Sequence, residues 1–441
     1  MQDSPNRYTR AMRTIRMPRW ASRIYESLWR ILARLLGTNV RFLARSATLV
    51  TISHGVSMLR GLITGYLVAR LFPRELYGQY QFILSVVGAI AVCGLPNMGT
   101  ALSRATARGE KGISLPVARI QFLISLLGSL ILLAVIPLLP PERSALWPLF
   151  LLAAVIFPIS QTANSFFAGL TIGNARFDAT LRANLAWSAI VIVATLAILL
   201  FHPSAILLYA TVTVLPALAY LWYGRKLLPT QEAAASVRHI VRYGISLTVV
   251  SLPMTLSWYL DKLLITGLLG LNQLAIFSVA LLMPEQVKVW AKELLPVSFA
   301  LQATGEDNRE RRLRLAGIVG RMTLLFAAGI VLYIFLAPFL FAILFPNYPD
   351  AVLLSQIFSL TLLAIPSTLI AQYMEAQAML SALRRSQWLS SVVFVIATLT
   401  LIPAYGLLGA VIARGILRCG YMCFTWFFLL RTPLSFSPHK Q

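Results

Sequence analysis

Twelve apolar segments, each of about 20 residues, determine what this chain can fold into. A helix of that length crosses the roughly 30 Å of hydrocarbon in a bilayer, so each segment is expected to span a membrane once. An apolar content of 58% and a mean hydropathy of +0.76 exceed what soluble domains carry. The sequence therefore predicts an all-α polytopic membrane protein. The segments lie near residues 46–70, 77–103, 116–139, 145–170, 183–202, 204–224, 243–269, 273–300, 316–345, 351–380, 387–403 and 406–430.

The basic residues of the loops predict how the segments are oriented. Arginine and lysine gather in every second loop, near 104–119, 176–182, 225–242, 309–321 and 384–385. The alternate loops hold only Arg70, Arg74 and Arg143. Because basic loops stay in the cytoplasm, both termini of this multi-pass protein are expected there.

The predicted spans divide the chain into two lobes of six helices around a central cavity. The first 45 residues carry ten arginines against Asp3 and Glu26. An amphipathic helix on the membrane surface and a disordered basic tail both fit this composition, and an organellar transit peptide is a minor alternative. No apolar core with a cleavage site is found there, so a signal peptide is not expected. The expected parts are a tail at 1–45, a first lobe at 46–224, a linker at 225–242, a second lobe at 243–430 and a tail at 431–441.

Composition excludes several classes of function. The net charge of +23 follows from the basic loops, so nucleic-acid binding is not expected. The three cysteines lie in apolar segments and the four histidines lack metal-ligand spacing, so neither a disulfide framework nor a metal site is predicted. No phosphate-binding P-loop motif occurs. The loops are too short for a folded catalytic domain, so we expect no catalytic residues and no cofactor.

Two short stretches suggest an internal repeat. Residues 71–80 (LFPRELYGQY) and 269–278 (LGLNQLAIFS) each mark a tight turn between the first and second helices of their half. Because each half has an even number of helices, both halves begin on the same side of the membrane, and the two copies are parallel. Paired halves of this kind favour alternating access to a site near the middle of the membrane.

These hairpins resemble those of a known family. The stretch YLVARLFPRELYGQYQFILSVVG (66–88) looks like the first hairpin of the polysaccharide-exporter (Wzx-type) flippases, which belong to the multidrug/oligosaccharidyl-lipid/polysaccharide (MOP) superfamily. YLDKLLITGLLGLNQLAIFSVA (259–280) is similar to the matching hairpin of their second half. The resemblance implies twelve to fourteen helices in two lobes, and transport of undecaprenyl-pyrophosphate-linked saccharides from the cytoplasmic to the outer leaflet of the cell inner membrane. The arginine-rich N-terminus departs from the family pattern.

Basic side chains within the apolar segments are the predicted substrate ligands. An ionisable group in hydrocarbon costs several kcal/mol, so such groups are expected to face a wet cavity lined by protein. Arginine and lysine bind phosphate through charge-assisted hydrogen bonds, which suits a lipid pyrophosphate. Snorkelling to the headgroups and structural ion pairs are the alternatives for each of them. The predicted ligands are Arg60, Lys262, Lys288, Lys292, Arg414 and Arg418.

Three carboxylates are candidates for ion coupling. Asp261 and Glu285 lie well inside apolar segments, and Glu375 lies closer to the cytoplasmic end of its segment. A carboxylate near the midplane can exchange its countercharge with Na+ or H+ as the lobes move. A salt bridge that locks one conformation is the alternative.

Other functions remain open alongside the flippase. A multidrug or metabolite exporter of the same superfamily is disfavoured by the excess of basic over acidic groups in the membrane. A glycan polymerase or ligase is disfavoured by the short loops. A scaffold that docks a glycan-synthesis complex through its basic tail is also consistent with the sequence. The expected partners are a lipid-linked oligosaccharide, membrane lipids and glycan polymerase or export machinery.

Overall fold

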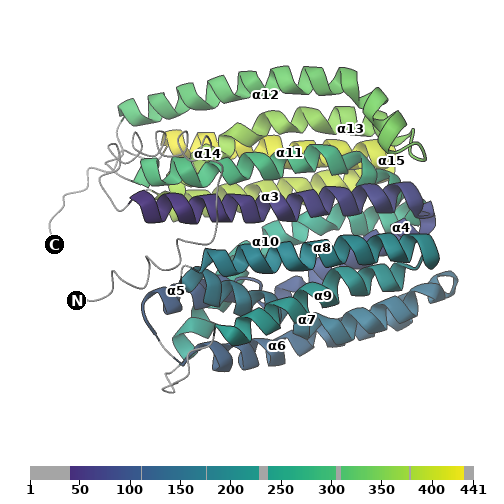
Figure 1. Ribbon diagram of the computed structural model, residues 1–441. Helices are drawn as coiled ribbons and strands as arrows, with labels where there is room; N and C mark the ends of the chain where they lie inside the picture. The colour runs from purple at the N-terminus through teal and green to yellow at the C-terminus, as the bar shows by residue number, and fades with distance from the viewer. Residues whose placement is uncertain are drawn as a thin grey trace, which may run out of the picture. The chain divides into compact units, whose positions relative to one another are not determined.

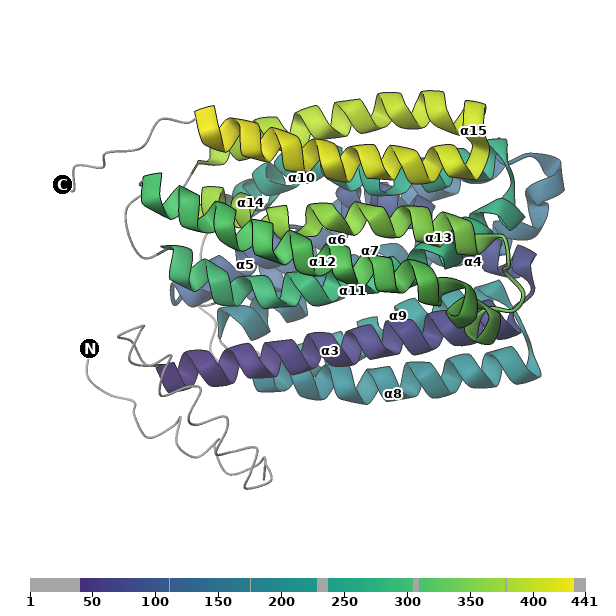
Figure 2. The ribbon, with the colours of Figure 1, turned by 90° about the horizontal axis from the view of Figure 1, so that it is seen from above.

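A computed structural model describes residues 40–110, 112–174, 176–227, 237–303, 309–376 and 379–431. Every regular element in these ranges is helical (Figures 1 and 2). The chain divides into two units, Met1–Thr51 and Ile52–Gln441. Of the first unit only the start of one helix is described, and the predicted surface helix within 1–45 lies mostly outside the described residues. The second unit contains the rest of the described chain.

The first six predicted spans coincide with helices, and the second of them is broken. Leu95 adopts a left-handed conformation (φ 51°), and Pro96 follows it. Gln121 donates to the freed carbonyls of Gly94 (2.8 Å) and Leu95 (3.3 Å), which satisfies backbone groups that hydrocarbon could not. The elements are α3 (Val40–Leu71), α4 (Arg74–Ile90), η2 (Ala91–Gly94), α5 (Met98–Ala107), α6 (Ser114–Val135), η3 (Ile136–Leu138), η4 (Pro141–Leu146), α7 (Trp147–Gly173), α8 (Phe177–Phe201) and α9 (Ala205–Lys226).

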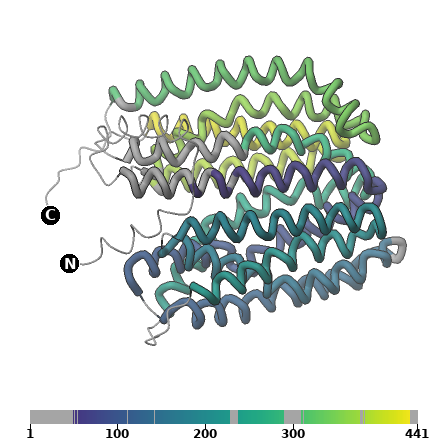
Figure 3. The backbone as a smooth tube through the Cα atoms, in the orientation of Figure 1, coloured from purple at the N-terminus to yellow at the C-terminus, as the bar shows by residue number. Residues whose placement is uncertain are grey.

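The last six predicted spans also coincide with helices, two of which depart from a straight α-helix. The tenth contains a 3₁₀ stretch with Pro366 inside it. The eleventh and twelfth spans form α15, which turns sharply at Gly406, where φ is 58° and ψ is −133°. The elements are α10 (Arg238–Leu268), α11 (Leu271–Ala303), α12 (Arg309–Leu344), α13 (Ala351–Ser359), η5 (Leu360–Ser367), α14 (Thr368–Ala376) and α15 (Leu380–Arg431), traced in Figure 3.

The surface of these helices is that of a membrane protein. Within the described residues, nine helical stretches are long and apolar enough to cross a membrane, and the bent α15 is one of them. Leu324, Phe335 and Phe339 on α12 are more than 60% exposed. Such a concentration of bare apolar side chains suits contact with lipid. The prediction of an all-α, multi-pass membrane protein is confirmed.

The two predicted tight turns occupy the predicted places. Two residues, Phe72 and Pro73, separate α3 from α4, and Leu269 and Gly270 separate α10 from α11. Gly270 has φ 91°, a value that glycine adopts without strain. The two hairpins pack together, because α4 contacts both α10 and α11.

Most other packing lies within each half of the sequence. Helix α7 packs against α5, α6 and α9, while α15 packs against α10, α14 and η5. Contacts of α4 and α5 with α10 and of α4 with α11 join the first half of the second unit (residues 52–226) to its second half (residues 238–431). The predicted division into two functional lobes at residues 225–242 stays a prediction.

Candidate functional site

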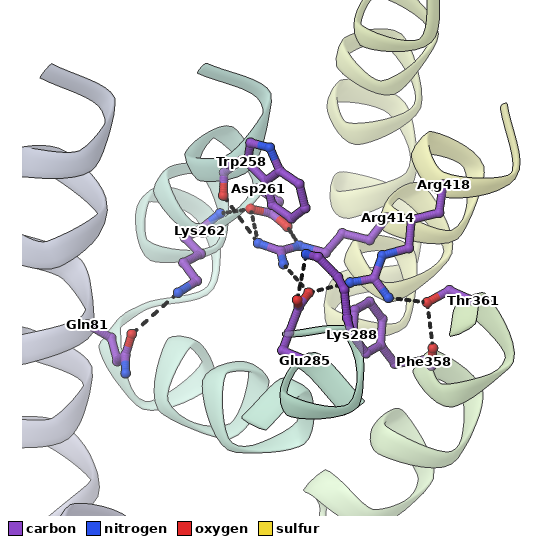
Figure 4. A network of polar contacts seen from close by, with 10 residues as sticks. All are labelled: Gln81, Trp258, Asp261, Lys262, Glu285, Lys288, Phe358, Thr361, Arg414 and Arg418. Carbon is purple, nitrogen blue, oxygen red and sulfur yellow. Dashed lines mark hydrogen bonds and ion pairs between the residues drawn. The ribbon is translucent and has the colours of Figure 1, made fainter. Parts of the chain in front are cut away.

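Three helices of the second half bring charged side chains together in the interior (Figure 4). Each helix contributes two, spaced by one, three or four residues. Spacings of three and four place both side chains on one helix face. Helix α10 packs on α15, which brings their faces into contact. The charged network consists of Asp261 and Lys262 from α10, Glu285 and Lys288 from α11, and Arg414 and Arg418 from α15.

Asp261 and Arg414 form a fully enclosed pair. Asp261 is 0% exposed and Arg414 is 6% exposed. The guanidinium donates from Nε to Asp261 Oδ2 and from Nη2 to Oδ1 (3.2 Å), and Nη2 also donates to the Trp258 carbonyl at 3.2 Å. Two parallel charge-assisted hydrogen bonds fix the geometry of such a pair. This pair therefore ties α15 to α10.

Glu285 is held by three cations. Lys288 donates to its Oε2 at 2.7 Å, while Arg418 and, at 3.4 Å, Arg414 donate to its Oε1. Arg418 also donates to Thr361 Oγ1 at 2.7 Å, at the start of the 3₁₀ stretch η5. A broken helix beside a charged site is the arrangement by which transporters present polar groups inside a membrane.

Lys262 points away from the carboxylates toward the first half of the chain. Its ammonium group donates to Gln81 Oε1 of α4 at 3.4 Å. The Asp261 carboxylate accepts instead from the Lys262 backbone N–H, at 2.8 Å. Lys288 lies over the Trp258 ring, 3.8 Å from its centroid, which adds a cation–π contact.

A cavity of about 330 Å³ adjoins this network. Among the described residues, its charged lining is Lys262, Lys288 and Arg414 against the carboxylate of Glu285. Positive charge is therefore in excess at the cavity wall, and an anion is the ligand that it favours. The other lining residues are Tyr77, Gln81, Trp258, Tyr259, Ser278, Leu281, Leu282 and Gln286.

Arg60 lies apart from this network, on α3. Its guanidinium lies over the Trp187 ring at 4.1 Å, and Tyr220 meets the same ring edge-on. Its Nε is buried and has no hydrogen-bond partner among the described residues. Helix α3 nevertheless passes the cavity wall, because a Cβ placed on Gly61 would lie 4.0 Å from Gln286. Arg60 is therefore the neighbour of a residue that approaches the cavity wall, but it is not part of the lining itself.

Two predicted site residues cannot be placed. Lys292 and Glu375 belong to α11 and α14, but their side chains lie outside the described part of the chain. The structure thus brings Asp261, Lys262, Glu285, Lys288, Arg414 and Arg418 together and leaves Arg60 separate. Their roles in substrate binding and ion coupling stay predictions.

Sequence reasoning missed three contributors to the site. Gln81 contacts Lys262, Trp258 contacts Lys288 and Arg414, and Thr361 contacts Arg418. Gln81 stands in the first quoted hairpin, where a polar residue between Tyr80 and Phe82 was an available signal. A tryptophan or threonine in an apolar segment carries no comparable signal.

Solved structures similar to this one are transporters. A multidrug resistance MATE family transporter of the MOP superfamily, in an inward-facing conformation, aligns with a TM-score of 0.62 at 15% identity over 85% of this chain and 94% of that chain. The lipid II flippase MurJ, in an inward closed conformation, aligns with a TM-score of 0.60 at 13% identity over 87% of each chain. A MOP superfamily transporter from Pyrococcus furiosus, described as having reverse polarity of its binding pocket, aligns with a TM-score of 0.57 at 16% identity over 88% of this chain and 94% of that chain.

These likenesses establish that this chain shares its fold with transporters of the MOP superfamily. No curated protein matches the sequence. The model of one family, described as polysaccharide biosynthesis protein, matches residues 43–285. Since that match covers more than half of the chain, including both hairpins and the first three members of the charged network, this protein belongs to the polysaccharide biosynthesis protein family.

Proposed function

We propose that this transporter moves undecaprenyl-pyrophosphate-linked oligosaccharides from the cytoplasmic to the outer leaflet of the cell inner membrane. The observation that carries the proposal is the excess of cationic side chains around the cavity between α4, α10, α11 and α15. A pyrophosphate is drawn from the headgroup region only by groups that replace its hydration. The sugar then occupies the wet cavity while the polyprenyl tail stays in lipid.

Within the network, the lysines are better suited to bind substrate than the arginines. Arg414 directs its donors to Asp261, Glu285 and a backbone carbonyl. The Lys262 ammonium group has three N–H donors, and its contact with Gln81 is a long one between a cation and a neutral amide. We therefore assign direct phosphate contact to Lys262, with Lys288 adding charge beside it.

Alternating access is the mechanism that this geometry supports. Lys262 belongs to the second half of the chain and Gln81 to the first, and both line the cavity. A substrate phosphate that binds Lys262 in place of Gln81 breaks this contact between the two halves. Substrate binding therefore changes how strongly the two halves are held together beside the cavity.

Ion coupling, by Na+ or H+, is assigned to Glu285 in preference to Asp261. The Glu285 side chain is 24% exposed and lines the cavity, whereas Asp261 is 0% exposed and enclosed by Arg414. An entering cation can reach Glu285 directly, whereas it can reach Asp261 only by first breaking the buried pair with Arg414. We place both termini in the cytoplasm on the arginine distribution of the loops.

The lipid-linked saccharide pool of cells that lack this protein tests the proposal. We expect a complete saccharide to accumulate on the cytoplasmic leaflet, and the wild-type protein to clear it. Lys262→Gln should leave the accumulation in place at normal protein level. Arg321→Gln is a matched control, because Arg321 is exposed and its contact, with the Gly317 carbonyl at 3.4 Å, lies within its own helix.

Other outcomes would assign other functions. Single repeat units on the outer leaflet would indicate a polymerase or ligase that acts after export. An unchanged pool would indicate a drug exporter or a scaffold, and would overturn the proposal.

A further inference from the structure

The three arginines that interrupt the loop-charge pattern contact helix ends and turns of the second half of the chain. Arg70 and Arg74 flank the turn between α3 and α4, and Arg143 lies in η4, before α7. All three belong to the first half of the chain. Each donates a hydrogen bond to a main-chain carbonyl of the second half.

Arg70 and Arg74 contact the turn between α12 and α13. Arg70 Nη1 donates to the Ile343 carbonyl at 3.0 Å, and Arg74 Nη2 donates to the Asn347 carbonyl. The Asn347 side chain donates back to the Arg70 carbonyl at 3.2 Å. Ile343 is within the last turn of α12, where carbonyls lack helical partners and carry partial negative charge.

Arg143 makes an equivalent contact on another helix. Its Nη2 donates to the Thr266 carbonyl at 2.9 Å, within the last turn of α10. Two helices of the second half, α10 and α12, thus end on arginines of the first half. These bonds need no carboxylate partner, so they can be exchanged for bonds to water without stranding a buried charge.

Aromatic side chains below the arginines connect this end to the cavity. The Tyr348 ring is fully buried, lies 5.2 Å from the Arg74 guanidinium and meets Tyr77 edge-on at 6.4 Å. Tyr77 itself lines the cavity. The arginine contacts and the two tyrosines therefore cover the cavity on the side of the α3–α4 turn.

We propose that Arg70, Arg74 and Arg143 form a latch that holds the cavity closed at the α3–α4 end, and that this latch releases when the two halves separate there. The proposal rests on the alternating access proposed above, but not on the identity of the substrate. It also accounts for basic residues on the face of the membrane where the loop pattern otherwise has none.

Accessibility of the cavity to a membrane-impermeant maleimide tests the latch. Ser278 lines the cavity and serves as the reporter, as Ser278→Cys in a protein whose three native cysteines are replaced by alanine. We expect Arg74→Gln/Arg143→Gln to speed labelling from the α3–α4 face at least roughly tenfold, because the loss of one hydrogen bond to a charged group already changes a population by about that factor and this variant removes two. Labelling is followed in intact cells and in inverted vesicles, so the face is identified by experiment.

The controls separate a latch from general loosening. Arg182→Gln removes an exposed arginine whose ion pair with Asp178 lies within α8, and it should leave the labelling rate unchanged. Tyr348→Phe keeps the ring beneath Arg74 and should also leave the rate unchanged. Variants are compared only where size-exclusion profiles match the parent protein. An unchanged rate in the latch variant, or an equal rise in the Arg182 variant, would overturn the latch whatever the lipid-linked saccharide assay shows.

Discussion

Replacing Arg414 by glutamine is the most direct test of the charged network. The change removes the cation from a carboxylate that is 0% exposed, and only the Lys262 backbone N–H is left to donate to Asp261 among the described contacts. Breaking one side of a buried ion pair costs about 3–5 kcal/mol, because the remaining charge stays out of water. We expect the free energy of unfolding to fall by that amount.

Unfolding in mixed micelles, followed by circular dichroism, measures the loss. The double variant Asp261→Asn/Arg414→Gln removes both charges and should recover most of the stability, because replacing a whole buried pair is often close to neutral. Arg321→Gln, a change at an exposed arginine, should stay within about 0.5 kcal/mol of wild type. An Arg414→Gln protein as stable as wild type, or a double variant no better than the single one, would refute the assignment of this pair as a structural tie.

Three further predictions concern anion binding at the cavity, the contact of α4 with α11 and the loop after α12. Glu285→Gln leaves three cations without their shared carboxylate, so inorganic pyrophosphate should bind roughly tenfold more tightly by calorimetry, and weaker binding would contradict the site. Gly78→Val should lower folded yield, because a Cβ there would overlap the Leu271 carbonyl oxygen of α11, and normal yield would contradict the packing. Burial raises the pKa of Tyr348, in the loop after α12, from 10.0 to about 12. The contribution of the protonated Tyr348 side chain to folding stability is therefore full below pH 10 and is lost as pH rises through 12. Tyr348→Phe should remove that alkaline loss of stability, and an unchanged pH profile would show that Tyr348 is not its source.

The sequence predicts the course of the chain well because membrane spans are local features. The positions of the twelve spans follow from the length of apolar runs, and the turns before Arg74 and Leu271 follow from short polar interruptions. Pro96 and Pro366 indicate kinks near Leu95 and in η5, but the sequence does not predict the form of these breaks. Their cause is partly tertiary, since Gln121 of another helix supplies the hydrogen bonds that the break after Gly94 requires.

The site was predictable as a set of charges but not as a set of pairs. Periodicity placed Arg414 and Arg418 on one face, and Glu285 and Lys288 on another. Periodicity does not say which faces meet, and the partner of Arg414 lies 153 positions away in the sequence. The separation of Arg60 from the network has the same cause, because its position depends on how α3 packs.

The ion pairs of the charged network reduce the number of cationic side chains that are available to a substrate. Taken one by one, the four basic residues of the network offer four sites for phosphate. In the structure, the two arginines are neutralised by Asp261 and Glu285, so much of their charge serves to join α10, α11 and α15. An anion that enters the cavity must then compete with Glu285 for Lys288, whereas at Lys262 it displaces only a neutral amide. Because displacing an amide costs less than displacing a carboxylate, the first contact of an anionic substrate should be with Lys262, on the side of the cavity where the two halves of the chain meet.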